Sequence, residues 1–86
     1  MANEPERPDI DYPCEWGFRL IGASEEALTV AVIEIVGDRP YRLEPSNSSR
    51  NGRWQSMRLT LEVLDEEDRL ALYQGLGTHD AVRMVL

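Results

Sequence analysis

Three arginines in separate β-rich segments form the first set of residues that could bind a ligand. Arg19, Arg58 and Arg83 each stand between apolar neighbours, and successive side chains of a strand point to opposite faces of a sheet. We therefore expect all three guanidinium groups on the solvent-exposed face of one sheet. Guanidinium groups bind carboxylates and phosphates through paired hydrogen bonds. The alternative is that Glu15 and Glu62, on the same face, form ordinary cross-strand ion pairs with them.

A second candidate lies at the junction between the first predicted strand and the first predicted helix. Gly22 lets the chain turn there, and Ser24 precedes the helix. Free backbone N–H groups at a helix start attract anions, so we include both residues with the arginines in the predicted ligand-binding set. Glu25 and Glu26 follow directly and would repel a phosphate. Simple capping of the helix by Ser24 is the competing interpretation.

The third candidate is a basic loop in an otherwise acidic chain. Arg50, Arg53 and Trp54 belong to a polar segment that predicts a hairpin loop. An aromatic ring beside arginines is typical of surfaces that stack on single-stranded nucleic acid. Sheets that bind RNA carry aromatic residues on their open face, whereas we expect Trp16 and Phe18 to point inward. We therefore predict an interaction hairpin, with a solvated loop as the alternative, and disfavour RNA as its ligand.

Residues suited to catalysis or metal binding are scarce. His79 is the only histidine, Cys14 is the only cysteine, and the chain has no lysine. A Ser/His/Asp or Cys/His arrangement would depend on one histidine in a predicted turn, and no spacing typical of a metal site is present. The sequence therefore predicts a protein that is not an enzyme and that binds neither a cofactor nor a metal.

The charge of the chain narrows its partners and its compartment. Sixteen acidic residues against nine arginines give a formal net charge of −7, which disfavours nucleic acid and anionic membranes as partners. A single cysteine cannot form a disulfide within the chain and suits a reducing compartment. No signal-peptide pattern or 18-residue apolar stretch is present. We therefore expect a cytoplasmic protein.

Alternating apolar residues predict the strands that position these side chains. Long strands are expected at 14–22 and 55–64, a short edge strand at 41–44 before Pro45, and a last strand at 80–86. In each long strand one face is apolar and the other is polar, which predicts a sheet that is half covered. The residues that we expect to face the core are Trp16, Phe18, Leu20, Met57, Leu59, Leu61, Val63, Val82, Met84 and Leu86.

Two amphipathic helices are predicted between these strands. The first begins after Ser24 and ends at Gly37, and the second begins after Asp65 and ends at Gly77. In the first helix a buried stripe of Leu28, Ala31, Val32, Ile35 and Val36 is expected, widened by Val30 and Ile33. In the second helix we expect the buried side to consist of Leu70, Tyr73 and Leu76, flanked by Leu72.

The predicted element order is β-α-β-β-α-β, and right-handed crossovers place both helices on the same face of the sheet. This predicts an α+β fold of the ferredoxin-like class, a four-stranded antiparallel sheet whose first and third strands are central. Residues 1–12 are rich in proline and acidic side chains, so we expect a flexible acidic N-terminal arm. Residues 13–86 are expected to form a single domain.

Several short motifs of the chain resemble those of the YbeD-like family of small bacterial proteins, sometimes labelled lipoate regulatory proteins. The resemblance covers roughly residues 12–86 and rests on Tyr12-Pro13, Gly22, Pro45-Ser46, Ser56, Leu72-Tyr73, Leu76-Gly77 and the ending Val82-Arg83-Met84-Val85-Leu86. It implies an ACT-like βαββαβ fold, which often dimerises and binds small molecules near the first strand–helix turn. It also implies a link to lipoate metabolism and supplies no catalytic residues.

Residues and resemblance together predict a non-enzymatic regulatory or protein-interaction module. Its partner would be another protein or a small carboxylate, and a homodimer is one of the assemblies that we expect. The alternative is an ACT-like sensor domain that binds a small carboxylate, and RNA binding is less favoured.

Overall fold

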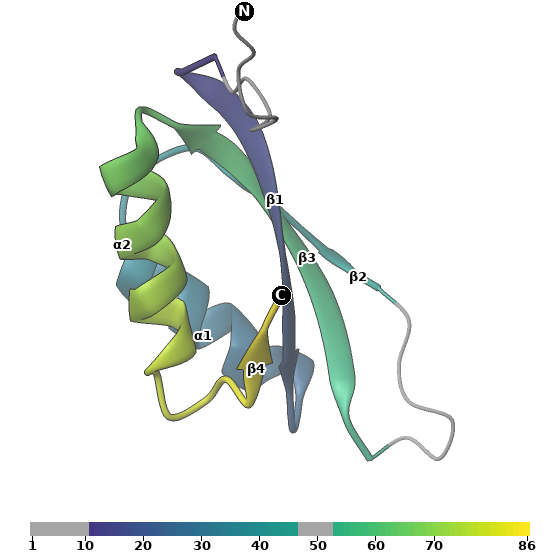
Figure 1. Ribbon diagram of the computed structural model, residues 1–86. Coiled ribbons are helices and arrows are strands. Elements are labelled where there is room, and N and C mark those ends of the chain that lie inside the picture. Colours follow the sequence, from purple (N-terminus) through teal and green to yellow (C-terminus); the bar gives the residue numbers. More distant parts are fainter. Residues whose placement is uncertain (1–10, 47–52) are drawn as a thin grey trace, which may run out of the picture.

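The computed structural model describes residues 11–46 and 53–86 and contains the predicted alternation of strands and helices. The four strands form one antiparallel sheet of order β2-β3-β1-β4. Both helices lie on one side of this sheet, and within residues 11–46 and 53–86 no helix lies on the other side (Figure 1). The predicted ferredoxin-like fold is confirmed, with β1 and β3 in the centre. The elements are β1 (Cys14–Gly22), α1 (Glu25–Val36), β2 (Arg42–Pro45), β3 (Gln55–Val63), α2 (Glu66–Gly77) and β4 (Met84–Val85).

The two central strands pair along their whole length, from Cys14 opposite Val63 to Gly22 opposite Gln55. Because apolar and polar residues alternate along most of both strands, one face of the pair is apolar from Cys14 and Val63 to Leu20 and Met57. Its side chains are packed beneath the helices, and burial of each large one contributes about 1.5–3 kcal/mol. The buried residues of this face are Phe18, Leu20, Met57, Leu59, Leu61 and Val63.

Helix α1 has the predicted ends and most of the predicted buried stripe. The Ser24 hydroxyl accepts a hydrogen bond from the Ala27 N–H at 3.0 Å, which caps the first turn. Gly37 ends the helix with a φ of 74°, a conformation that favours glycine. Leu28, Ala31, Val32 and Val36 are buried, and Ile35 is half-buried.

Both helices bury a narrower face than the sequence predicted. Val30 and Ile33 of α1 are roughly half exposed, because the single sheet covers only one side of the helix. In α2 the core is contacted by Leu72 and Leu76, whereas Leu70 and Tyr73 are roughly half exposed. The predicted core face of α2 is therefore confirmed for Leu76 and for the flanking Leu72, and is wrong for Leu70 and Tyr73.

The face of α2 is set by its contact with α1. A Cβ atom at Gly75 would lie 3.2 Å from Ile35 Cγ2, so the two helices approach closely at this glycine. With Gly75 turned toward α1, the neighbouring Leu72 and Leu76 point to the sheet and Tyr73 points away.

The last strand is shorter than predicted, and the residues that point toward the core are not the predicted ones. Only Met84 and Val85 form β4, and Val85 lies opposite the buried Leu20 of β1. Val85 is buried, whereas Met84 and Leu86 are 48% and 61% exposed. Val82 is buried too, but it belongs to a turn in which its N–H donates to the His79 carbonyl. The turn breaks the alternation, so the prediction that Met84 and Leu86 face the core is wrong.

Candidate functional site

The uncovered side of the sheet, called here the open face, carries the outward residues of the strands. Along β1 these are Glu15, Gly17, Arg19 and Ile21, and they lie opposite Glu62, Thr60, Arg58 and Ser56 of β3. Two outward residues that lie directly opposite each other on β1 and β3 are called here a row. Along the strands the successive rows are Glu15–Glu62, Gly17–Thr60, Arg19–Arg58 and Ile21–Ser56.

Arg19 and Arg58, called here the arginine pair, are direct cross-strand partners with exposed side chains. Arg19 Nη2 donates a hydrogen bond of 3.5 Å to the Ser46 hydroxyl. Within residues 11–46 and 53–86 the Arg58 side chain has no hydrogen bond or ion pair. On its other side Arg58 lies directly opposite Glu44 of β2, whose carboxylate lies 3.7 Å from Arg42 Nε instead. Neither arginine of the pair thus forms an ion pair among these residues, although a carboxylate lies in the neighbouring strand.

Glu15 and Glu62, called here the glutamate pair, are also direct partners and are exposed. In the part of the chain that the structure describes, neither carboxylate forms an ion pair with a basic side chain. The expected alternative, ion pairs between these glutamates and the arginines, is therefore absent there. The two pairs are four residues apart along the strands, or about 13 Å. Like charges that lie directly opposite each other in a sheet are destabilising.

Arg83 lies beside Trp54 rather than beside the arginine pair. It precedes β4, its N–H donates to the Ile21 carbonyl at 2.7 Å, and its guanidinium lies 5.5 Å from the centre of the Trp54 ring. A hollow of about 340 Å³ adjoins this contact and is also lined by Ala23, Ala27 and Asp80. Arg83 of the predicted ligand-binding set is therefore in contact with Trp54 of the predicted interaction hairpin.

Two other members of that hairpin give less information. Arg53 is exposed next to Trp54, and Arg50 lies outside the described residues. The predicted interaction hairpin therefore stays a prediction.

At the strand–helix junction Gly22 is closely packed and Ser24 caps helix α1. A Cβ atom at Gly22 would lie 2.6 Å from the Ala81 carbonyl oxygen and 2.7 Å from Leu28 Cδ2. The Ser24 hydroxyl is the acceptor at the start of α1. These contacts give both residues a structural role, and their predicted part in ligand binding stays a prediction.

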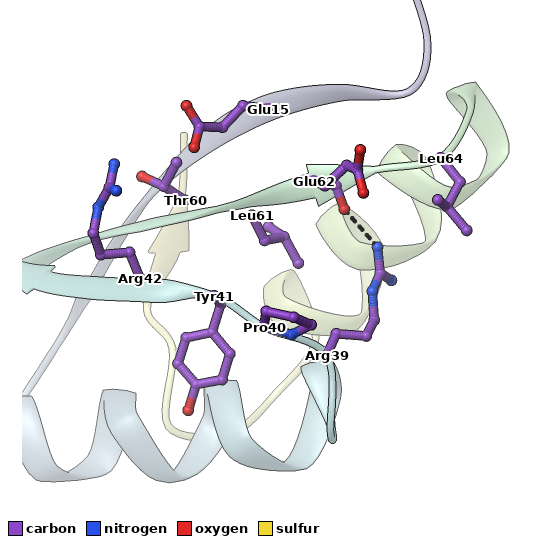
Figure 2. A pocket seen from close by; sticks show the side chains of 9 residues that line it. All are labelled: Glu15, Arg39, Pro40, Tyr41, Arg42, Thr60, Leu61, Glu62 and Leu64. Carbon is purple, nitrogen blue, oxygen red and sulfur yellow. Dashed lines mark hydrogen bonds between the residues drawn. The ribbon is translucent and has the colours of Figure 1, made fainter.

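A pocket of about 610 Å³ lies at the end of the sheet where β2 begins (Figure 2). Glu15, Thr60 and Glu62 line it from the central strands, and Tyr41 and Arg42 line it from the edge. The pocket exists because the chain before β2 diverges from β3 and leaves an opening between the two strands. Both residues of the glutamate pair thus belong to the polar part of the pocket lining.

Arg39 closes one end of this pocket. Its Nη2 donates to the Glu62 carbonyl oxygen at 2.7 Å (Figure 2), and its two terminal nitrogens donate to Asp68 at 3.0 and 2.8 Å. The Arg39 hydrogen bond lowers the pKa of the Asp68 carboxyl, as does a hydrogen bond from the Leu64 N–H. The same contact raises the pKa of Arg39 above its ordinary value. This pair joins the end of α1, the end of β3 and the start of α2.

His79 connects the turn after α2 with α1. Its Nδ1 accepts a hydrogen bond from the Ala81 N–H at 3.0 Å, and its Nε2 lies 2.7 Å from Glu34 Oε1. Because Nδ1 is an acceptor, the neutral ring carries its proton on Nε2 and donates it to the glutamate. Both ring nitrogens are thus engaged in contacts that hold the fold together.

Two further properties of the described residues bear on the class of site. Among them, no group of three histidine, cysteine, aspartate or glutamate side chains is placed to hold a metal ion. No helix in the same part of the chain is long and apolar enough to span a membrane.

Comparison with known proteins identifies the family. The family model described as "Protein of unknown function (DUF493)" matches residues 7–86. The chain belongs to the DUF493 family. An uncharacterised protein of Helicobacter pylori is 30% identical over all 86 residues of both chains. A UPF0250 protein of Hahella chejuensis is 31% identical over 98% of this chain and 97% of its own. The predicted resemblance to YbeD-like proteins is confirmed.

A solved structure supports the fold of this DUF493 protein. The solution structure of protein HP0495 from H. pylori matches with a TM-score of 0.80 and 28% identity, over 100% of this chain and 98% of that one. The likeness extends the ferredoxin-like arrangement to a relative of nearly the same length.

Sequence reasoning missed two contacts in this DUF493 protein. In the sequence Arg39 is one of nine arginines, and Asp68 is one of four consecutive acidic residues around the start of α2. His79 and Glu34 are 45 positions apart. No local pattern indicates that these pairs meet, because each contact depends on how the two helices lie relative to each other.

Proposed function

We propose that this DUF493 protein is a non-catalytic interaction module that binds a carboxylate-bearing protein partner on the open face of its sheet. The observation that carries the proposal is the arginine pair, in which Arg19 and Arg58 lie directly opposite each other on a face that no helix covers. Such an arrangement costs free energy in the isolated chain. A partner that supplies carboxylates would relieve this repulsion, because each guanidinium group could form paired hydrogen bonds with a carboxylate.

The shape of the face favours a broad partner over a small enclosed ligand. Between the arginine pair and the glutamate pair lie only Gly17 and the half-buried Thr60. A Cβ atom added to Gly17 would meet nothing within 4 Å. Small ligands are usually bound in concave sites, whereas a flat face that presents both charges is suited to another protein surface.

A small-carboxylate sensor is the second candidate, and one specific observation favours it. The exposed Met84 and Leu86 lie beside the central strand, and Leu86 exchanges backbone hydrogen bonds with Arg19 at 3.2 and 2.9 Å. An acid with an alkyl chain, such as lipoate or octanoate, could place its carboxylate on Arg19 and its chain along these two side chains.

An NMR titration distinguishes the two candidates. The ¹⁵N-labelled protein is titrated with a glutamate-rich peptide, with lipoate and with octanoate, and single-stranded RNA serves as the negative control. We expect the peptide to shift the amide signals around Arg19 and Arg58, and the double substitution Arg19→Gln with Arg58→Gln to remove the shifts. Arg69→Gln is the control, because Arg69 lies on α2 and its guanidinium contacts the Trp16 ring rather than the open face. Shifts confined to the helices, or unchanged in the double variant, would refute the proposal.

The compartment and the pathway are part of the proposal. A single cysteine and an acidic surface support a cytoplasmic location, and the YbeD-like resemblance supports a regulatory role in lipoate metabolism. In a strain that lacks the gene, we expect altered levels of lipoyl-lysine on a protein blot. The wild-type gene should restore them and the Arg19→Gln, Arg58→Gln gene should not. Equal restoration by both genes would separate the open face from that pathway.

A further inference from the structure

We propose that the open face binds the same face of a second copy of this chain, related by a twofold axis. This inference rests on the proposed function, because it names the partner of the same surface. Its basis is the order of charges along the central strands. The glutamate pair lies two residues to one side of the Gly17–Thr60 row, and the arginine pair lies two residues to the other side.

A twofold axis along the Gly17–Thr60 row makes the two faces complementary. This axis runs between the two sheets, at right angles to the strands. Rotation about it places each strand over the same strand of the other copy, with the two strands running in opposite directions. Arg19 of one copy then lies over Glu15 of the other, and Arg58 lies over Glu62. Because a twofold interface repeats every contact, the dimer contains four ion pairs between copies. Each arginine and each glutamate of the two pairs then faces an opposite charge on the other copy.

The residues on the axis permit close approach. Gly17 has no side chain and open space around it, and the Thr60 side chain is half-buried. Two sheets that pack face to face with aligned strands lie about 10 Å apart, a distance that arginine and glutamate side chains can bridge. Arg42 occupies the outer end of the same row, where it would approach its own copy. Its charge is offset there by Glu44 at 3.7 Å.

The size of the face indicates a weak complex. Nine residues of β1 or β3 extend about 30 Å, and four strands are about 14 Å wide between their axes. Because β2 and β4 are shorter than the central strands, the two copies would bury at most about 800 Å², which is below the range of stable interfaces and typical of transient ones. We expect a dissociation constant in the micromolar range or weaker, and association that weakens as salt is added.

Paired charge reversal tests this arrangement directly. An acidic-face variant carries Arg19→Glu and Arg58→Glu, and a basic-face variant carries Glu15→Arg and Glu62→Arg. Sedimentation and NMR diffusion are measured at high protein concentration and low salt. We expect wild type to associate, each variant alone to be monomeric, and an equimolar mixture to form a heterodimer that is at least tenfold tighter than wild type. A control with Glu26→Arg and Glu67→Arg, both exposed on the helices, should associate as wild type does.

The mixture keeps the test meaningful even if a variant is less stable, because a misfolded variant cannot restore association. A variant that still dimerises alone, or a mixture of two folded variants that stays monomeric, would overturn the inference. A monomeric wild type would also overturn it. In that case shifts of the arginine pair with the glutamate-rich peptide would still support the proposed function, so the two failures are distinguishable.

Cross-linking locates the axis. In a Cys14→Ala background, Gly17→Cys places a thiol next to its own copy, and a short bis-maleimide should join the two chains. Gln74→Cys, on the exposed side of α2, is the control and should give no covalent dimer at the same concentration. Equal cross-linking at both positions would contradict the proposed axis.

Discussion

Replacing Asp68 by asparagine tests the ion pair that joins the connection after α1 to the start of α2. The Asp68 carboxylate accepts hydrogen bonds from Arg39 at 3.0 and 2.8 Å and from the Leu64 N–H at 2.9 Å. The side chains of Arg39 and Asp68 are 32% and 20% exposed. The pair is thus shielded more than an ordinary surface ion pair but remains in contact with water.

These contacts set the expected loss of stability. A hydrogen bond to a charged group contributes about 1.5–3 kcal/mol when it is well shielded, and an exposed ion pair contributes about 0–1 kcal/mol. Asparagine keeps the shape, loses the charge, and turns one acceptor into a donor that faces Arg39. We therefore expect Asp68→Asn to lower the free energy of unfolding by about 1–2 kcal/mol, which corresponds to about 4–8 °C in Tm for each kcal/mol.

The pH dependence provides an independent check. The pKa of Asp68 is lowered in the folded protein, chiefly by the hydrogen bond from Arg39. A carboxyl with a lowered pKa contributes its full stability above its unfolded pKa of about 3.9 and loses it as the pH falls through the folded value. The difference between wild type and Asp68→Asn should therefore be constant near neutral pH and shrink below about pH 4.

Urea unfolding followed by circular dichroism measures both effects. Glu67→Gln is the matched control, because Glu67 lies in the same helical turn and is exposed. We expect the control to change the free energy of unfolding by less than about 0.5 kcal/mol. An equal loss in the control would refute the reasoning, and so would a difference that stays constant down to the lowest pH at which both proteins fold.

Two further substitutions test packing at the strand–helix junction and at the turn after α2. Gly22→Ala should lower the free energy of unfolding by about 2–3 kcal/mol through overpacking, whereas Gly17→Ala on the same strand should change it by no more than about 0.5 kcal/mol. Equal thermal stability of the two variants would contradict the close packing at Gly22. His79→Ala should cost about 1–2 kcal/mol because it removes two hydrogen bonds. A double-mutant cycle with Glu34→Ala should give a coupling of at least about 0.5 kcal/mol, and strict additivity would exclude the contact.

The order of elements could be predicted because each carries its own local signal. Apolar and polar residues alternate along most of β1 and β3, and Ser24 and Asp65 accept hydrogen bonds at the two helix starts as expected. These signals depend on neighbours in the chain. Right-handed crossovers then leave few arrangements for four strands and two helices.

The faces of α2 and of the last segment could be predicted only in part, because they depend on distant contacts. Four apolar residues of α2 lie on several sides of the helix, and only the approach of Ile35 to Gly75 decides which of them reach the sheet. In the last segment, a turn stabilised by the His79 carbonyl shifts the phase before β4 begins. Alternation read along the sequence has no means of detecting such a shift.

The open face illustrates how the core decides the position of charges. Alternation correctly placed Arg19 and Arg58 on the outside, but whether each faces a glutamate or an arginine depends on the pairing register. Phe18 lies opposite Leu59 in the observed register, and burying each such side chain contributes about 1.5–3 kcal/mol. A like-charge pair costs at most about 1 kcal/mol. Burial therefore determines the register, which leaves Arg19 opposite Arg58 on the outer side of the sheet, with Glu44 on the far side of Arg58. The same register arranges the acidic and basic rows symmetrically about Gly17, and that symmetry is the physical basis for expecting a second copy there.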